Sequence, residues 1–142
     1  MAVASHERRP YGSFNFRVVL GESGRETLGF CEVVFPDFPV RAPAARRRPA
    51  ESTDRPATLV LRRGFDGRPE LYDWWNEVRR ARKKPPARTV TVELLNETRR
   101  TVARWTFTGC RPIALAYSPL DAQASAVLIE TLELSFENME LR

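Results

Sequence analysis

Hydrophobic residues with helical spacing form the clearest pattern in the chain, between residues 69 and 82. They recur at intervals of three and four positions and therefore share one face: Leu71, Trp74, Trp75 and Val78. Pro69 suits the first helical turn, and Pro85 with Pro86 stops the helix. Two adjacent tryptophans can also form a ligand platform. Their spacing beside other apolar residues favours a buried, structural role.

After the helix, residues alternate with the period of a half-buried strand. Val90, Val92 and Leu94 share one face of the segment 88–96, and polar side chains occupy the other face. A polar, turn-like stretch separates this segment from a second alternating segment at residues 101–108. The pattern predicts an antiparallel hairpin, followed by a loop over residues 109–126.

A last strand is predicted over residues 126–136, but one charged residue breaks its pattern. Glu130 falls on the same face as Leu128, Leu132 and Leu134. Either a β-bulge shifts the register, or Glu130 points into an interface.

Near the start of the chain, Phe14, Phe16, Val18 and Leu20 alternate with more polar residues. The glycines at 21 and 24 predict a hairpin turn that joins this strand to a second one at residues 27–34. The aromatic residues that follow are too concentrated for a nucleic-acid stacking platform, because basic residues are not interleaved with them. They indicate a core or a subunit seam.

Together these elements predict a mainly β single domain with one α-helix, spanning residues 11–142 after an N-terminal tail of residues 1–10. A chain of 142 residues with 42% hydrophobic residues can fill one core. The predicted buried residues are Phe14, Phe16, Val18, Leu71, Trp74, Trp75, Val78, Val90, Val92, Leu94, Trp105, Phe107, Leu132, Leu134 and Phe136.

Residues 40–57 form an unusual segment that is rich in proline, alanine and arginine and has no periodicity. It predicts an extended or flexible loop. Its arginines form a candidate basic site: Arg41, Arg46, Arg47, Arg48 and Arg55. Residues 41–63 hold seven arginines against two acidic residues, a balance of +5 that equals the net charge of the whole chain.

The residue types needed for most enzyme chemistry are sparse. His6 is the only histidine and lies in the predicted tail, so we expect no catalytic residues, no metal site and no cofactor. Cys31 and Cys110 are widely separated and lack metal-site spacing, which predicts two small buried apolar residues. No apolar run is long enough to span a bilayer and the start lacks a signal-peptide core, so synthesis in the cytoplasm is expected.

The order of several short motifs resembles the tail-tube family of contractile phages and phage-like injection systems. The match covers about residues 57–141, and residues 11–34 fit the first two strands of the family. The motifs that carry the resemblance are Leu61-Arg62-Arg63-Gly64, Glu70-Leu71-Tyr72-Asp73-Trp74, Val90-Thr91-Val92-Glu93-Leu94-Leu95-Asn96-Glu97, Ala103-Arg104-Trp105-Thr106, Pro112, Leu120-Asp121-Ala122 and Ile129-Glu130-Thr131-Leu132-Glu133-Leu134. No single motif is specific, but their order and spacing are.

The resemblance implies a β-barrel-like or sandwich-like subunit with one flanking helix and no enzymatic activity. Such subunits close into hexameric rings, and the rings stack into a hollow tube that a contracting sheath drives through a target envelope. The implied partners are the protein itself, sheath and baseplate proteins, and cargo in the lumen.

The sequence departs from the family at the Arg-rich segment, where an acidic, glycine-containing stretch is usual. Two hypotheses follow from this difference. The segment orders on contact with an acidic surface of the next subunit, or the protein is a specialised paralogue that initiates the tube at the baseplate. The sequence does not distinguish a phage from a bacterial injection system.

A second class of function stays open because of the arginine cluster and the isoelectric point near 9.9. A basic loop binds nucleic acid without sequence preference when phosphate neutralisation releases counterions. The alternative is a solvated charged loop, and the sequence does not show which way the segment points.

Overall fold

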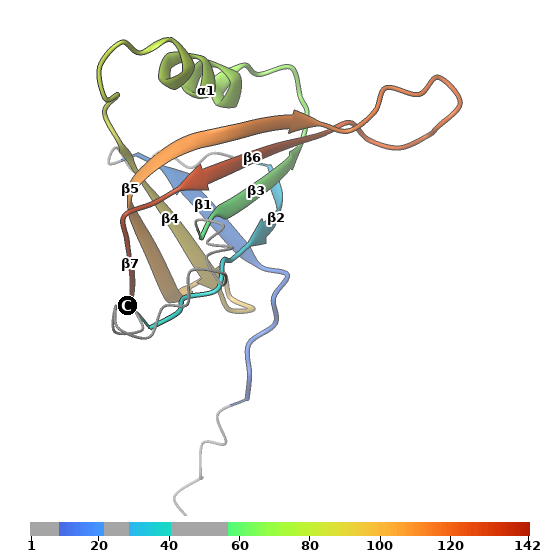
Figure 1. Ribbon diagram of the computed structural model, residues 1–142. Coiled ribbons are helices and arrows are strands. Elements are labelled where there is room, and N and C mark those ends of the chain that lie inside the picture. Colours follow the sequence, from blue (N-terminus) through green and yellow to red (C-terminus); the bar gives the residue numbers. More distant parts are fainter. Residues whose placement is uncertain (1–8, 22–28, 41–56) are drawn as a thin grey trace, which may run out of the picture.

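A computed structural model describes residues 9–21, 29–40 and 57–142 of the chain. It contains seven strands and one helix within these ranges (Figure 1). The elements are β1 (Phe16–Leu20), β2 (Phe30–Val34), β3 (Leu59–Gly64), α1 (Glu70–Arg80), β4 (Arg88–Leu95), β5 (Thr101–Tyr117), β6 (Ile129–Ser135) and β7 (Asn138–Leu141). No helix in the described ranges is long and apolar enough to cross a membrane.

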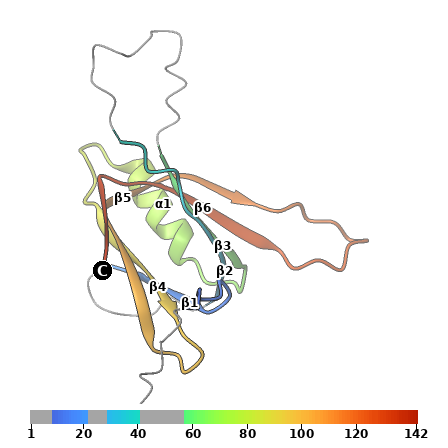
Figure 2. The same ribbon diagram turned by 90° about the horizontal axis from the view of Figure 1, so that it is seen from below.

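All strand pairings are antiparallel, and the strand order is β1-β4-β5-β6-β3-β2, with β7 also paired to β5. The long strand β5 joins two halves of the sheet. Its first part pairs with β4 and β7, and its second part, from Arg111, pairs with β6. The two halves face each other across the core, which confirms the mainly β fold with one flanking helix (Figures 1 and 2).

Gly109 lies where β5 passes from one half of the sheet to the other. Its φ angle of 71° is in the left-handed region, which side chains disfavour. A Cβ atom at this position would also lie 2.6 Å from the Glu137 side chain. Only glycine therefore satisfies both the backbone conformation and the close approach of the segment between β6 and β7.

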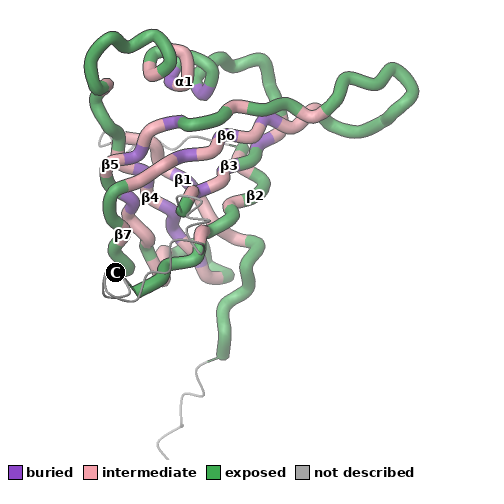
Figure 3. The backbone as a smooth tube through the Cα atoms, in the orientation of Figure 1, coloured by how far each residue is buried: buried purple, intermediate pink, exposed green. Residues whose placement is uncertain are grey.

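The core lies between the two halves of the sheet and continues beneath α1, as the buried stretches of backbone show (Figure 3). Its fully buried hydrophobic residues include Val18, Leu59, Leu61, Leu71, Trp74, Val90, Val92, Phe107, Cys110, Leu132 and Leu134. The helix contributes Leu71 and Trp74, with Val78 partly buried, and packs against β5. This confirms the apolar helix face predicted from the sequence.

Several predicted core residues are only half-buried at the edges of this core: Phe16, Trp75, Val78, Leu94, Trp105 and Phe136. The prediction for Phe14 is wrong, because this residue is 82% exposed and precedes the first strand. The prediction for Cys31 is also wrong. Cys110 is buried as expected, whereas Cys31 lies exposed on the edge strand β2.

The strand predictions need three corrections. The predicted loop over residues 109–126 is shorter, because β5 continues to Tyr117 through its pairing with β6. The last predicted strand, over residues 126–136, corresponds to β6 and begins later, at Ile129, and β7 is an additional strand that was not predicted. The predicted hairpin between the first two strands does not form, because β1 pairs with β4 and β2 pairs with β3. Residues 22–24 of its turn lie outside the described ranges.

Candidate assembly site

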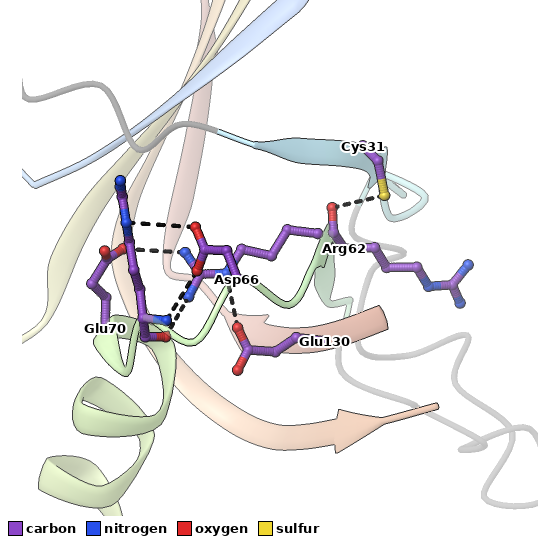
Figure 4. Close-up of polar contacts among 7 residues, drawn as sticks. Cys31, Arg62, Asp66, Glu70 and Glu130 are labelled. Atoms are coloured by element: carbon purple, nitrogen blue, oxygen red, sulfur yellow. Dashed lines mark hydrogen bonds and ion pairs between the residues drawn. The ribbon is translucent and has the colours of Figure 1, made fainter. Parts of the chain in front are cut away.

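A buried ion network lies between the sheet and the N-terminal end of α1 (Figure 4). The guanidinium of Arg63, on β3, donates hydrogen bonds to Glu130 Oε1 at 2.8 Å and to Glu70 Oε2 at 3.2 Å. It also donates to the backbone oxygen of Arg68 at 3.0 Å. The side chains of Arg63 and Glu130 are 1% and 0% exposed, so the pair is shielded from solvent.

This network joins three of the sequence motifs that carry the family resemblance. Arg63 precedes the glycine of the first motif, Glu70 begins the helix motif, and Glu130 belongs to the last strand motif. Burial disfavours the Arg63 cation, but the hydrogen bonds and charges of the two glutamates outweigh burial and raise the pKa of Arg63. The network therefore favours the charged form of Arg63 inside the fold.

The register explains why a glutamate occupies the apolar face of the last strand. Glu130 lies opposite Arg63 on β3 and opposite Tyr117 on β5, with a continuous register between β3 and β6. The pairing of β6 with β5 does contain a register shift, but it lies between Pro112 and Ala114 on β5. Glu130 thus has a partner inside the subunit, and a role for it in an interface between subunits stays a prediction.

Two polar atoms near this network have no hydrogen-bond partner within the described residues: Trp74 Nε1 and Glu130 Oε2. Burial and the neighbouring Glu130 raise the pKa of Tyr117. Tyr117 on β5, Glu130 on β6 and Arg63 on β3 lie opposite one another and form a row across the three strands. The row connects β3 to both strands of the β5–β6 hairpin at the point where the hairpin leaves the body.

A second charged cluster lies across β1, β4 and β5. Glu93 Oε2 accepts a hydrogen bond from Thr101 Oγ1 at 2.7 Å and pairs with Arg17 at 3.4 Å and Arg104 at 3.3 Å. Burial opposes ionisation of Glu93, but these hydrogen bonds and the Arg17 charge outweigh it and lower its pKa. One carboxylate therefore ties three neighbouring strands together.

The lowered pKa of Glu93 predicts that its stabilising effect depends on pH. A carboxylate whose pKa is lowered by folding stabilises the protein fully above its ordinary pKa of 4.5, and the effect is lost as pH falls through the lowered value. We expect Glu93→Gln to reduce the free energy of unfolding by about 1 kcal/mol at pH 7. Urea unfolding of both proteins at pH 7 and pH 3 measures the difference, which should shrink at pH 3. A constant difference would contradict the ion-pair assignment.

The hairpin of β5 and β6 extends beyond the body of the domain (Figures 1 and 2). We call residues 118–129, which project beyond the paired part of β5 and β6, the arm. The large hydrophobic side chains of Leu120 and Val127 on the arm are exposed, as are Ile113 and Tyr117 on the part of β5 that leads to it. Sequence analysis missed the arm because it predicted a loop here. Its low content of charged residues was the signal that could have revealed it.

A groove of about 420 Å³ opens between β1 and β2, which lie at opposite ends of the strand order. We call it the seam groove. Apolar side chains line most of it, including Phe16, Val33, Phe35 and Trp105, and Cys31 and Tyr11 also contribute to its wall. Phe35 packs on Trp105 with the ring centroids 5.0 Å apart. The seam groove is thus an apolar opening between β1 and β2, which do not pair with each other in the described residues.

Within the described residues, β1, β2 and β7 each pair with one strand only. Each therefore presents a free edge with backbone groups able to pair with another strand. The candidate arginines of the basic segment, Arg41, Arg46, Arg47, Arg48 and Arg55, lie outside the described residues. The described residues therefore offer three features that could make contacts between subunits: free strand edges, an apolar groove and a projecting arm.

The sequence of residues 12–140 matches the protein family described as T4-like virus tail tube protein gp19. Comparison with curated protein sequences gives no match.

Three solved structures illustrate the similarity of the fold. A chain of the PVC sheath-tube complex, an extracellular contractile injection system in its extended state, is 19% identical with a TM-score of 0.71, covering 96% of this chain and 93% of that one. A chain of the PVC sheath/tube terminator is 19% identical with a TM-score of 0.77 and coverages of 96% and 99%. A chain of the anti-feeding prophage baseplate is 23% identical with a TM-score of 0.68 and coverages of 95% and 97%.

Proposed function

The chain belongs to the T4-like virus tail tube protein family, and from that premise we propose that it forms hexameric rings that stack into, or initiate, the inner tube of a contractile phage tail or phage-like injection system. The observation that carries this proposal is the set of free strand edges on β1, β2 and β7. Free edges of an isolated domain favour aggregation unless they are covered. In a closed ring, neighbouring subunits cover them.

A ring of this kind uses a heterologous contact, in which one surface of a subunit meets a different surface of the next. The subunit offers different edges on its two sides, since β1 and β7 border one half of the sheet and β2 borders the other. Head-to-tail repetition of such contacts closes a ring when the rotation between subunits allows it. The role of the protein is then mechanical: no group in this arrangement needs to transform a substrate.

Sheath and baseplate proteins are the proposed partners, because structures of similar fold come from a sheath-tube complex and a baseplate. The protein would be made in the cytoplasm and then become part of an assembled particle, with cargo held in its lumen. The arginines at positions 41, 46, 47, 48 and 55 are proposed to contact a neighbouring subunit or to line the lumen.

A tube initiator is the closest alternative, since the Arg-rich segment departs from the family pattern and one similar fold belongs to a baseplate. Nucleic-acid binding by that basic segment is a separate alternative, because arginine clusters bind phosphates with strong salt dependence. The two alternatives predict different oligomeric states: a tube initiator forms rings, whereas a nucleic-acid-binding protein can act without forming them.

Electron microscopy of the purified protein across a salt series tests these functions. We expect hollow rings that stack and that persist as salt rises, because closure by strand edges and apolar contacts is weakly screened. Single rings that never stack would favour the initiator. Monomers that bind nucleic acid, with an affinity that falls steeply with salt, would contradict the tube assignment.

A further inference from the structure

The arm has a composition unlike the rest of the chain. Asp121 is its only charged residue among the twelve residues 118–129, whereas 29% of the whole chain is charged. Leu120 and Val127 are nevertheless 87% and 67% exposed. Depletion of charge combined with exposed apolar side chains is typical of the core of an interface between proteins.

Hydrogen bonds hold the arm at its base and order its tip. The Ser118 backbone N–H donates to the Ile129 oxygen at 2.9 Å, and the Ile129 N–H donates to Ser118 Oγ at 2.8 Å. At the tip, Asp121 Oδ1 accepts a hydrogen bond from the Gln123 N–H at 2.9 Å. Because these bonds constrain its base and its tip, the arm loses less conformational entropy on binding than an unconstrained loop would.

The base of the arm is anchored on both strands. Glu130 follows the arm directly and is bound to Arg63, and Tyr117 packs edge-on against Phe65 with the ring centroids 5.8 Å apart. The Phe65 N–H also donates to the Leu128 oxygen at 2.8 Å. These contacts fix the direction in which the arm leaves the body, away from its own domain (Figure 2).

The seam groove is the surface of this chain that matches the arm. Its wall is mainly apolar, and its one acidic residue, Glu32, is neutralised by an ion pair with Arg62. A neutral apolar arm and an apolar groove match in charge and polarity, whereas a charged partner would have to be desolvated on entry. The arm extends away from the body that carries β1 and β2, the strands that border the groove, so the arm and the groove can meet only between copies (Figures 1 and 2).

We infer that the arm of one copy docks into the seam groove of a second copy, with Leu120 and Val127 as the contacting side chains. The inference rests on the proposed ring function and names the surfaces of one contact between subunits. The contact is heterologous, because arm and groove are different surfaces, and it can therefore repeat from one copy to the next. Docking covers the apolar groove and removes the exposed arm residues from water.

Native Cys31 provides a direct test, because it is exposed and lies in the wall of the groove. In the Leu120→Cys variant, oxidation with diamide should join the introduced arm thiol of one copy to Cys31 of the next, since docking brings the two within disulfide range. The expected result is a ladder of covalent oligomers on a non-reducing gel. Cys110 should not compete, because burial raises its pKa to about 11.

Two matched controls define the result. The Leu120→Cys/Cys31→Ser variant should lose the ladder, and Arg80→Cys, an exposed position on α1, should not form it with Cys31. A separate variant, Leu120→Asp, should raise the protein concentration needed for ring formation at least about tenfold. Its thermal unfolding should match the wild type, because Leu120 makes no core contact.

The outcomes separate the inference from the proposed function. Rings in the electron microscope without a ladder in Leu120→Cys, or with unchanged assembly of Leu120→Asp, would overturn arm docking and leave the ring function intact. A wild-type protein that forms no rings at any concentration would instead reject the proposed function. A covalent dimer that still forms from Leu120→Cys after Cys31→Ser would place the arm against another copy's arm and overturn the groove assignment.

Discussion

Replacing Trp74 by alanine is expected to lower the free energy of unfolding by about 3 to 5 kcal/mol, the largest loss that we expect for a single core position among the described residues. The side chain is 1% exposed and is the largest fully buried one in the described residues. It lies where α1 packs on β5, and Arg88 stacks on its ring at 4.9 Å from the centroid. Removing it leaves a cavity and deprives the helix of its main anchor. Urea unfolding followed by circular dichroism measures the loss.

Two neighbouring variants control for the position and the chemistry of Trp74. Trp75→Ala should cost less, because that ring is only half-buried and packs on Tyr72 and Arg79 at the surface. Trp74→Phe should also cost less than the alanine variant, since it keeps most of the ring volume and removes the buried Nε1, which has no hydrogen-bond partner in the described residues. Equal losses for Trp74→Ala and Trp75→Ala would reject the assignment of Trp74 as the core anchor.

Replacing Glu130 by leucine is expected to cost about 3 kcal/mol of unfolding free energy, because it leaves the buried Arg63 cation without its closest partner. Glu70 remains at 3.2 Å, but it is partly exposed and is a weaker substitute. The double variant Arg63→Met/Glu130→Leu should recover most of the loss, since it removes the isolated charge and fills the same space with apolar groups. Chemical unfolding of the single and double variants gives the coupling between the two side chains.

Arg62, which precedes Arg63 on β3, supplies a matched control. Arg62 pairs with Glu32 on the other side of β3, where both side chains are nearly half-exposed. Glu32→Leu should change the unfolding free energy by less than about 1 kcal/mol, because exposed ion pairs contribute little. If Glu130→Leu were no more costly than Glu32→Leu, the buried network would not be a stabilising feature of the fold.

The two sets of variants also separate stability from assembly. The Trp74 side chain is buried inside the subunit, and its loss should reduce assembly only to the extent that it unfolds the domain. Leu120 lies outside the core, and its replacement should affect assembly without affecting stability. Measuring unfolding and ring formation for the same proteins therefore distinguishes a folding role from an interface role.

Elements with strong local periodicity could be predicted from the sequence. The helix, strand β4 and the first part of β5 each carry an apolar face that is visible within a few residues, because a buried face needs hydrophobic side chains at the period of its backbone. The order of these elements and their motifs was sufficient to indicate the family. The Arg-rich segment was also identifiable by composition, although its arginines lie outside the described residues.

Pairing between strands that are distant in the sequence decided the remaining elements of the fold. The second part of β5 is rich in small residues and contains Pro112, so it has little alternation of its own and becomes a strand by pairing with β6. Likewise, β1 and β2 had the local signature of a hairpin, but β4 and β3 compete successfully as partners. Hydrogen-bonding groups of a strand are the same along its length, so the local sequence does not specify which strand will satisfy them.

The candidate site depended most on the folded arrangement of the chain. Arg62 and Arg63 are adjacent and chemically identical, yet one is exposed and the other is buried against Glu130, sixty-seven positions away. The order of amino acids was enough to establish the helix, the main strands and the family, since these depend on the local pattern of apolar residues. Folding alone created the buried ion network, the seam groove and the projecting arm, because each requires residues that are distant in the sequence to be brought together or held apart in space.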